Sequence, residues 1–121
     1  MDDIAFTSRN TETFLSVQTV DVSAFDQPIG ANRFVLHLRR NAADPGLPAV
    51  AFDTLDDTLE VVSEDTEEAT LTLKFCQLDT SATCRLTGNF VGDLVVVIED
   101  RLHVVATATA TFTTGVTRVA L

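Results

Sequence analysis

The chain has 121 residues, 45% of them hydrophobic and 21% charged, and its 18 acidic and 8 basic side chains give a formal net charge of −10. We therefore expect one folded domain over residues 1–121, with a single hydrophobic core. So acidic a surface argues against nucleic acid or an anionic membrane as a partner, because both attract cationic surfaces. No apolar run approaches the roughly 20 residues of a membrane helix. The acidic start Met1-Asp2-Asp3 has no apolar stretch behind it, so we expect no signal peptide and synthesis in a reducing cytoplasm.

Alternation of apolar and polar residues, which is typical of half-buried strands, recurs along the chain. In chain order it predicts strands at Ile4–Thr7, Phe14–Val22, Arg33–Arg40, Val50–Asp53, Leu59–Ser63, Thr70–Cys76, Asp93–Ile98, Leu102–Phe112 and Val116–Leu121. The segment Leu78–Leu86 fits either a loop or one helical turn, and the apolar run Asp93–Ile98 suggests a strand buried on both faces. Seven to nine short strands separated by turns indicate an all-β fold, an antiparallel β-sandwich of the Ig-like or jelly-roll-like kind.

One face of the alternating strands supplies the expected core. In the longest strand, Leu102, Val104 and Ala106 begin the apolar face, whereas His103 and Val105 fall on the opposite face. The predicted core consists of Phe34, Leu36, Leu38, Leu71, Leu73, Phe75, Leu94, Val96, Ile98, Val104, Ala106 and Phe112.

The search for catalytic groups finds little. The two histidines, His37 and His103, each lie on the polar face of a predicted strand, where we interpret them as solvated positions. Nothing in the sequence places a nucleophile and a buried carboxylate beside either of them, as a catalytic triad requires. The glycines form no phosphate-binding loop. We therefore predict that the protein is not an enzyme, and we assign no catalytic, cofactor-binding or metal-binding residue.

Two cysteines, Cys76 and Cys84, are separated by seven residues. Two free, largely buried thiols are the favoured interpretation in a reducing cytoplasm. A disulfide that forms later is an alternative, and it requires the Leu78–Leu86 segment to double back. Redox or metal chemistry is disfavoured, because the spacing is not that of a Cys-x-x-Cys pair.

Acidic residues are concentrated between Arg40 and Lys74, a stretch without a basic residue. The nine acids are Asp44, Asp53, Asp56, Asp57, Glu60, Glu64, Asp65, Glu67 and Glu68. A solvated strand edge and turn is the favoured interpretation, because charge discourages strand edges from pairing with other chains. Calcium binding within Asp53–Glu68 is an alternative, with Asp53, Asp56, Asp57 and Glu60 as candidate ligands, although the spacing is not that of an EF-hand. Docking of the acidic stretch onto a basic partner is a third interpretation.

The C-terminal third carries a resemblance. Gly88-Asn89-Phe90-Val91-Gly92-Asp93-Leu94 precedes an apolar strand, the charged turn Glu99-Asp100-Arg101, a long alternating strand and Gly115-Val116-Thr117-Arg118. This order resembles small tailed-phage virion proteins and is similar to the N-terminal β-sandwich domain of the upper baseplate protein of lactococcal phages. Upstream, Arg9–Phe14 stands where such proteins have a Gly-Asp-Thr-Phe-like opening, and Ile29-Gly30-Ala31 precedes their second element. The chain departs from the pattern at Gly92, where we expect an aromatic residue, and at Asn10, where we expect glycine.

The resemblance implies a non-enzymatic structural protein of a tailed-phage virion, in the tail, baseplate or fibre-attachment region. It would act by packing against other virion proteins and against copies of itself in a symmetric oligomer, with no cofactor. Alternatives are a capsid decoration protein and a stand-alone bacterial binding module. Carbohydrate binding by such a module is disfavoured, because the chain has neither Trp nor Tyr to stack on a sugar ring.

Overall fold

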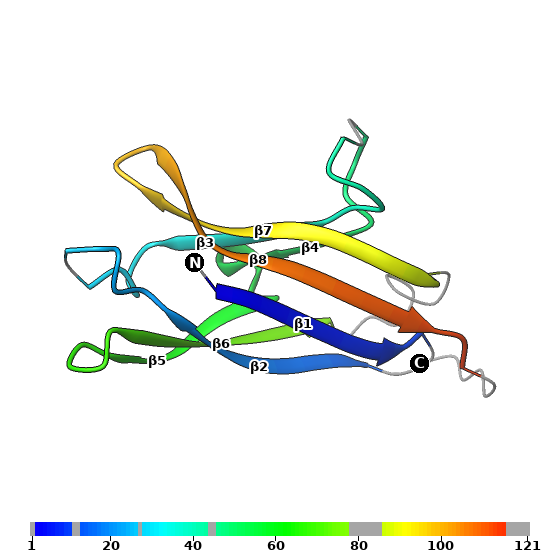
Figure 1. The fold of residues 1–121 in the computed structure, drawn as a ribbon, viewed down its shortest axis with the longest axis horizontal. Helices are drawn as coiled ribbons and strands as arrows, with labels where there is room; N and C mark the ends of the chain where they lie inside the picture. The colour runs from blue at the N-terminus through cyan, green and yellow to red at the C-terminus, as the bar shows by residue number, and fades with distance from the viewer. Residues whose placement is uncertain (1, 11–12, 27, 44–45, 78–85, 116–121) are drawn as a thin grey trace.

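Two β-sheets packed face to face form the protein in the computed structural model, which describes residues 2–10, 13–26, 28–43, 46–77 and 86–115 (Figure 1). The predicted all-β sandwich is confirmed. The expectations for Cys84, the strand Val116–Leu121 and most of Leu78–Leu86 lie outside the described residues.

The larger sheet has five strands, and in spatial order they are β1 (Asp2–Arg9), β8 (Arg101–Thr113), β7 (Gly88–Ile98), β3 (Arg33–Leu38) and β4 (Val50–Asp53). Its pairings are antiparallel except for that of β1 with β8, which is parallel. The first and the last described strands of the chain therefore lie side by side. β7 begins five residues before the predicted start at Asp93, because the residues from Gly88 onward pair with β8 up to Phe112.

The smaller sheet has three antiparallel strands, in the order β2 (Phe14–Asp21), β6 (Thr70–Gln77) and β5 (Leu59–Asp65). A short 3₁₀ turn, η1 (Thr54–Asp56), connects β4 of the larger sheet to β5 of the smaller one. The strand edges β1 and β2 lie next to each other along one side of the sandwich (Figure 1).

Aromatic rings from both sheets join in the core. Phe6 and Phe52 come from the larger sheet and Phe14 and Phe75 from the smaller, and adjacent ring centroids are 5.0–5.5 Å apart. Tilted and edge-on contacts at these distances are the favoured aromatic geometries. The predicted core residues are buried with two exceptions: Ile98 is partly buried against the core, and Val104 is exposed.

The expected facing of Leu102 and Val104 is wrong. Leu102 is 70% exposed and Val104 42% exposed, whereas Val105, placed on the polar face, is 3% exposed. A β-bulge is the cause: Leu94 pairs with Ala106 but the next residue, Val95, pairs with Val104, so that Val105 has no partner. One extra residue shifts the alternation of side chains by one position. The part of β8 before the bulge thus presents the opposite face from the one that strict alternation predicts.

Candidate functional site

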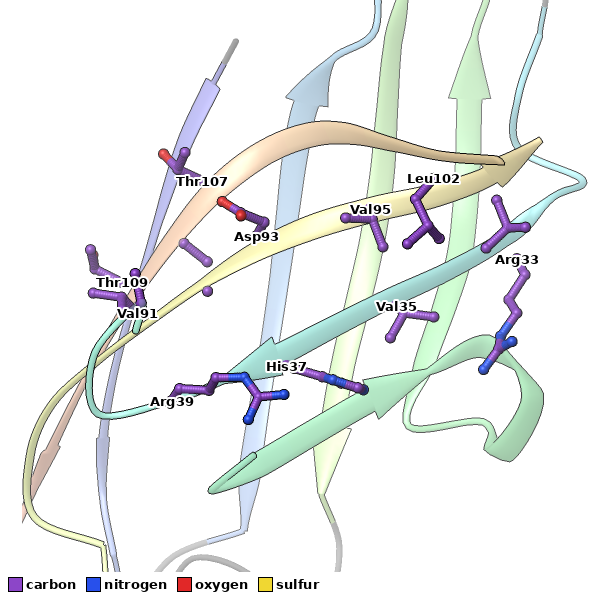
Figure 2. A pocket seen from close by; sticks show the side chains of 14 residues that line it. Arg33, Val35, His37, Arg39, Val91, Asp93, Val95, Leu102, Thr107 and Thr109 are labelled. Carbon is purple, nitrogen blue, oxygen red and sulfur yellow. The ribbon is translucent and has the colours of Figure 1, made fainter. Parts of the chain in front are cut away.

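The outer face of the larger sheet is hollowed into a groove of about 640 Å³ over β3, β7 and β8 (Figure 2). Its side chains come from the strand positions that point away from the sandwich core. Surfaces built on paired strands are held rigidly, which favours precise recognition over adaptable binding.

Val35, Val95, Val97 and Leu102 line the groove at the end nearest the β7–β8 turn, and the exposed Val104 adjoins them on β8. Val35, Val95 and Val104 lie next to one another across β3, β7 and β8, and Val97 pairs with Leu102 in the adjoining row. We call these five residues the aliphatic patch. The bulge at Val105 completes the patch, because it turns Leu102 and Val104 outward beside the valines of β7. The expectation that Asp93–Ile98 is buried on both faces is therefore wrong: Val95 and Val97 are only partly covered.

Basic residues line the β3 side of the groove. Arg33 and His37 lie on the outward face of β3, and Arg39 follows the end of the strand (Figure 2). Arg33 pairs with Asp53 through Nε–Oδ1 and Nη2–Oδ2 contacts of 3.0 and 2.5 Å. These bonds lower the pKa of Asp53 and raise that of Arg33, because each ion stabilises the charged form of the other. Arg39 instead donates from Nη1 to the carbonyl oxygen of Gly46.

The side of the groove opposite β3 is polar, and one acidic residue lies on β7 next to it. Asp93 of β7 is exposed and pairs across the sheet with Thr107 of β8, whose hydroxyl donates to Asp3 of β1. Thr109 continues this side along β8 (Figure 2). The groove therefore has a basic wall on β3 and a polar wall of threonines on β8, with one carboxylate, that of Asp93, on β7 between them.

Gly92, where the resemblance predicted an aromatic residue, lies at a close approach of β7 to β3. A Cβ atom built on it would lie 2.2 Å from the carbonyl oxygen of His37, so no side chain fits without moving the backbone. Beyond this point the two strands meet again in the bridge between Arg39 and Val91. Glycine at position 92 therefore lets β3 and β7 stay paired on both sides of this close approach.

The acidic residues proposed as calcium ligands act in turns and ion pairs. Asp53 accepts the amide of Leu55 in addition to Arg33, Asp56 accepts the amide of Thr58 at 3.0 Å, and Glu60 pairs with Lys74 at 3.3 Å. Asp57 has a left-handed backbone, with φ of 64°. Within the described part of the chain, His, Cys, Asp and Glu side chains form no cluster of three that could hold a metal ion.

Glu64 has a structural role that its position in the acidic run did not indicate. Its Oε2 accepts the amides of Ile29 and Gly30 at 2.9 and 3.2 Å, across 35 and 34 residues of sequence. The carboxylate thus fixes the loop before β3 onto β5. Asp65 acts locally and accepts the amides of Glu67 and Glu68 in the β5–β6 turn.

The two histidines are not brought together. His37 is exposed on the outer face of the larger sheet, beside Asp53. His103 is exposed too, but it pairs with the buried Val96, and its ring meets that of Phe25 with centroids 6.1 Å apart. His103 is thus solvated as predicted, but it lies on the same face of the sheet as the buried Val96, because the bulge reverses the facing of the residues in front of it. Cys76 is half-buried near the end of β6, and the pairing with Cys84 lies outside the described residues.

No protein-family model matches this chain, and a search of curated proteins finds no significant match. In the described ranges, no helix is long and apolar enough to cross a membrane.

Proposed function

We propose that the protein is a non-enzymatic structural component of a tailed-phage virion, in the tail, baseplate or fibre-attachment region, and that it acts by packing against other proteins. The order of turn and strand residues from Gly88 to Leu121 supports the virion assignment. The aliphatic patch on the larger sheet supports the proposal that the protein acts by packing against other proteins.

The patch supports protein packing because of where its residues lie. Isolated exposed apolar residues are ordinary, but a continuous group bordered by polar residues is typical of a partner-binding surface. Here five aliphatic side chains from three strands adjoin one another, beside Arg33 of the basic wall. Bulges that redirect side chains are also over-represented at functional sites.

A stand-alone binding module is the second candidate, and one observation favours it. The groove volume of about 640 Å³ falls within the range of small-molecule sites, which are lined mainly by apolar side chains with a few polar groups. A capsid decoration protein would use the same kind of surface on the head instead of the tail. The two virion locations are distinguished by which particle part the protein joins.

Co-sedimentation with phage particles that lack the protein tests the proposal. We expect the purified protein to sediment with the tail or baseplate, and the exposed substitution Leu102→Asp to reduce the bound fraction at least tenfold. Leu15→Asp is the matched control, because Leu15 is 63% exposed on the smaller sheet, away from the patch. Binding should also weaken as salt shortens the range of the charged residues of the groove.

Other outcomes separate the candidates. Binding to empty heads and not to tails would favour the decoration protein. A soluble monomer in infected cells that never joins particles would overturn the virion proposal. Binding that is constant up to 1 M salt would contradict a contribution from the charged residues of the groove.

A further inference from the structure

We infer that the groove receives a second copy of this chain: the exposed Leu55 of one copy's η1 turn inserts into the groove of the next. This inference rests on the proposed function and deepens it, because it names one partner of the same surface. We call the η1 turn together with Asp57 the knob.

The knob presents an aliphatic side chain between carboxylates. Leu55 is 74% exposed, and the two residues that follow it, Asp56 and Asp57, are exposed as well. Leu47 is exposed even more, but the described residues next to it, Gly46 and Pro48, carry no charge. Leu15 and Val17 are exposed on the paired surface of β2, which offers no protruding turn.

Hydrogen bonds hold the knob in shape. The amide of Leu55 donates to Asp53 Oδ1 at 3.0 Å, and the amide of Thr58 donates to Asp56 Oδ1 at 3.0 Å. Thr54 accepts the amide of Phe34 and so ties the turn to β3. A side chain that protrudes from an ordered turn loses little conformational entropy when it binds, which favours association.

The groove complements the knob in polarity and in charge. The aliphatic patch matches the leucine, and the basic wall matches the carboxylates of Asp56 and Asp57. Arg33 is already neutralised by Asp53, whereas Arg39 bonds a carbonyl oxygen and takes no part in the ion pairs between described residues. Arg39 therefore keeps donors for an incoming carboxylate, since a guanidinium has five N–H groups.

The contact joins two different surfaces. The knob follows β4, the strand at one edge of the larger sheet, whereas the groove lies over β3, β7 and β8. Such an interface is heterologous, and repeating it generates either a closed ring or an open filament. A ring of copies is compatible with a symmetric position in a particle.

Sedimentation equilibrium between about 5 and 500 µM tests the inference. We expect the parent to form species larger than a dimer as concentration rises. Leu55→Asp and Leu102→Asp should each lower the association constant at least tenfold, with unchanged circular dichroism because both side chains are exposed. Leu15→Asp, the control on the other sheet, should associate like the parent.

Mixing the two defective variants gives the sharpest result. Leu55→Asp keeps an intact groove and Leu102→Asp keeps an intact knob, so an equimolar mixture should form a one-to-one dimer that grows no further. A contact of groove with groove or of knob with knob predicts no such rescue and would overturn the inference.

Charge coupling provides an independent measurement. Arg39→Gln and Asp57→Asn should each weaken association about two- to fivefold, and the double variant should be weaker by less than the product of the two, because both remove the same contact. Effects that multiply fully would contradict a contact between these residues. Asn is tolerated in the left-handed conformation of residue 57.

The two proposals fail differently. A parent that stays monomeric at 500 µM, with Leu102→Asp still losing particle binding, would overturn the second copy as occupant and leave the virion role standing. Self-association with the predicted variant pattern, without any uptake into particles, would overturn the virion role and support the knob-and-groove contact.

Discussion

Asn10 connects three segments of the larger sheet at a single buried position. Its side chain donates to the carbonyl oxygen of Leu86 at 3.1 Å and accepts the amide of Gly115 at 3.0 Å. Its own amide donates to the carbonyl oxygen of Thr113 at 2.9 Å. The residue therefore joins the end of β1 to the entrance of β7 and to the exit of β8. Glycine, which the resemblance predicted here, has no side chain to make these bonds.

We predict that Asn10→Ala lowers the free energy of unfolding by about 2–3 kcal/mol, because it removes the side-chain partners of a buried amide and a part-buried carbonyl. The control is Asn89→Ala, since Asn89 makes an exposed cross-strand bond to Thr111, and we expect it to cost less than about 1 kcal/mol. Urea denaturation measures both. Equal losses would show that the Asn10 bonds do not hold the segments together.

Asp53 makes stability depend on pH in an acidic range. Its pKa is lowered by the bond from Arg33 and by the Leu55 amide, against partial burial that raises it. The ionised form is favoured in the folded state, so its contribution is present above the unfolded pKa of about 3.9 and is lost as pH falls through the lower folded value. Because the pair is largely at the surface, we expect about 0.5–1 kcal/mol.

The measurement compares the parent with Asp53→Asn and Arg33→Gln from pH 7 to pH 2. Each variant should be less stable than the parent by a constant amount above about pH 5. The difference should shrink below about pH 4, where the parent loses the same interaction. A difference that is independent of pH would contradict the ion pair as its source.

At the scale of single elements, the bulge in β8 makes opposite predictions for two neighbouring valines. Val105→Asp should lower the free energy of unfolding by about 3 kcal/mol or more, because it buries a carboxylate without a partner. Val104→Asp should change it by less than about 1 kcal/mol, because Val104 faces outward. Thermal melting followed by circular dichroism compares the two. A larger loss of stability for Val104→Asp than for Val105→Asp would contradict the bulge and support strict alternation along β8.

Most strands were predictable because each alternates for four or more residues around a one-sided core. Val50–Asp53 was predicted at its observed bounds, and Thr70–Cys76 lacked only Gln77. The bulge was not predicted because Leu102–Phe112 alternates without a gap. An apolar residue at a polar position, Val105, was the only sign of the bulge in the sequence. A phase shift depends on pairing with β7, which periodicity within one strand does not record.

The candidate site was not predictable for the same physical reason. The groove gathers side chains from β3, β7 and β8, and its aliphatic floor includes Leu102, which the alternation placed on the apolar face of its strand. The role of Glu64 was hidden as well, because its partners are 34 and 35 residues away and its sequence neighbours are equally acidic. The parallel pairing of β1 with β8 likewise joins the two ends of the described chain.

Over the whole molecule, charge protects the strand edges while the face of the larger sheet stays open. β5 is an edge strand that carries Glu60, Glu64 and Asp65, and like charges discourage pairing between edges of two copies. A net charge of −10 also opposes random contact between copies. The contact proposed between copies uses the surface where Arg33, His37 and Arg39 interrupt the acidic field.

The same net charge predicts how salt and calcium act on stability. Raising NaCl from 0.01 to 0.15 M shortens the Debye length from about 30 to about 8 Å, so self-repulsion falls and the melting temperature should rise by a few degrees.

Adding millimolar calcium to the 0.15 M solution should change the melting temperature by no more than about one degree, because Asp53, Asp56 and Glu60 already bond amides or cations of the chain. Magnesium at the same concentration is the control for general screening. A ligand at 100 times its dissociation constant adds about 2.7 kcal/mol, and a calcium-specific rise of that size would show that the acidic run binds the ion in spite of those bonds.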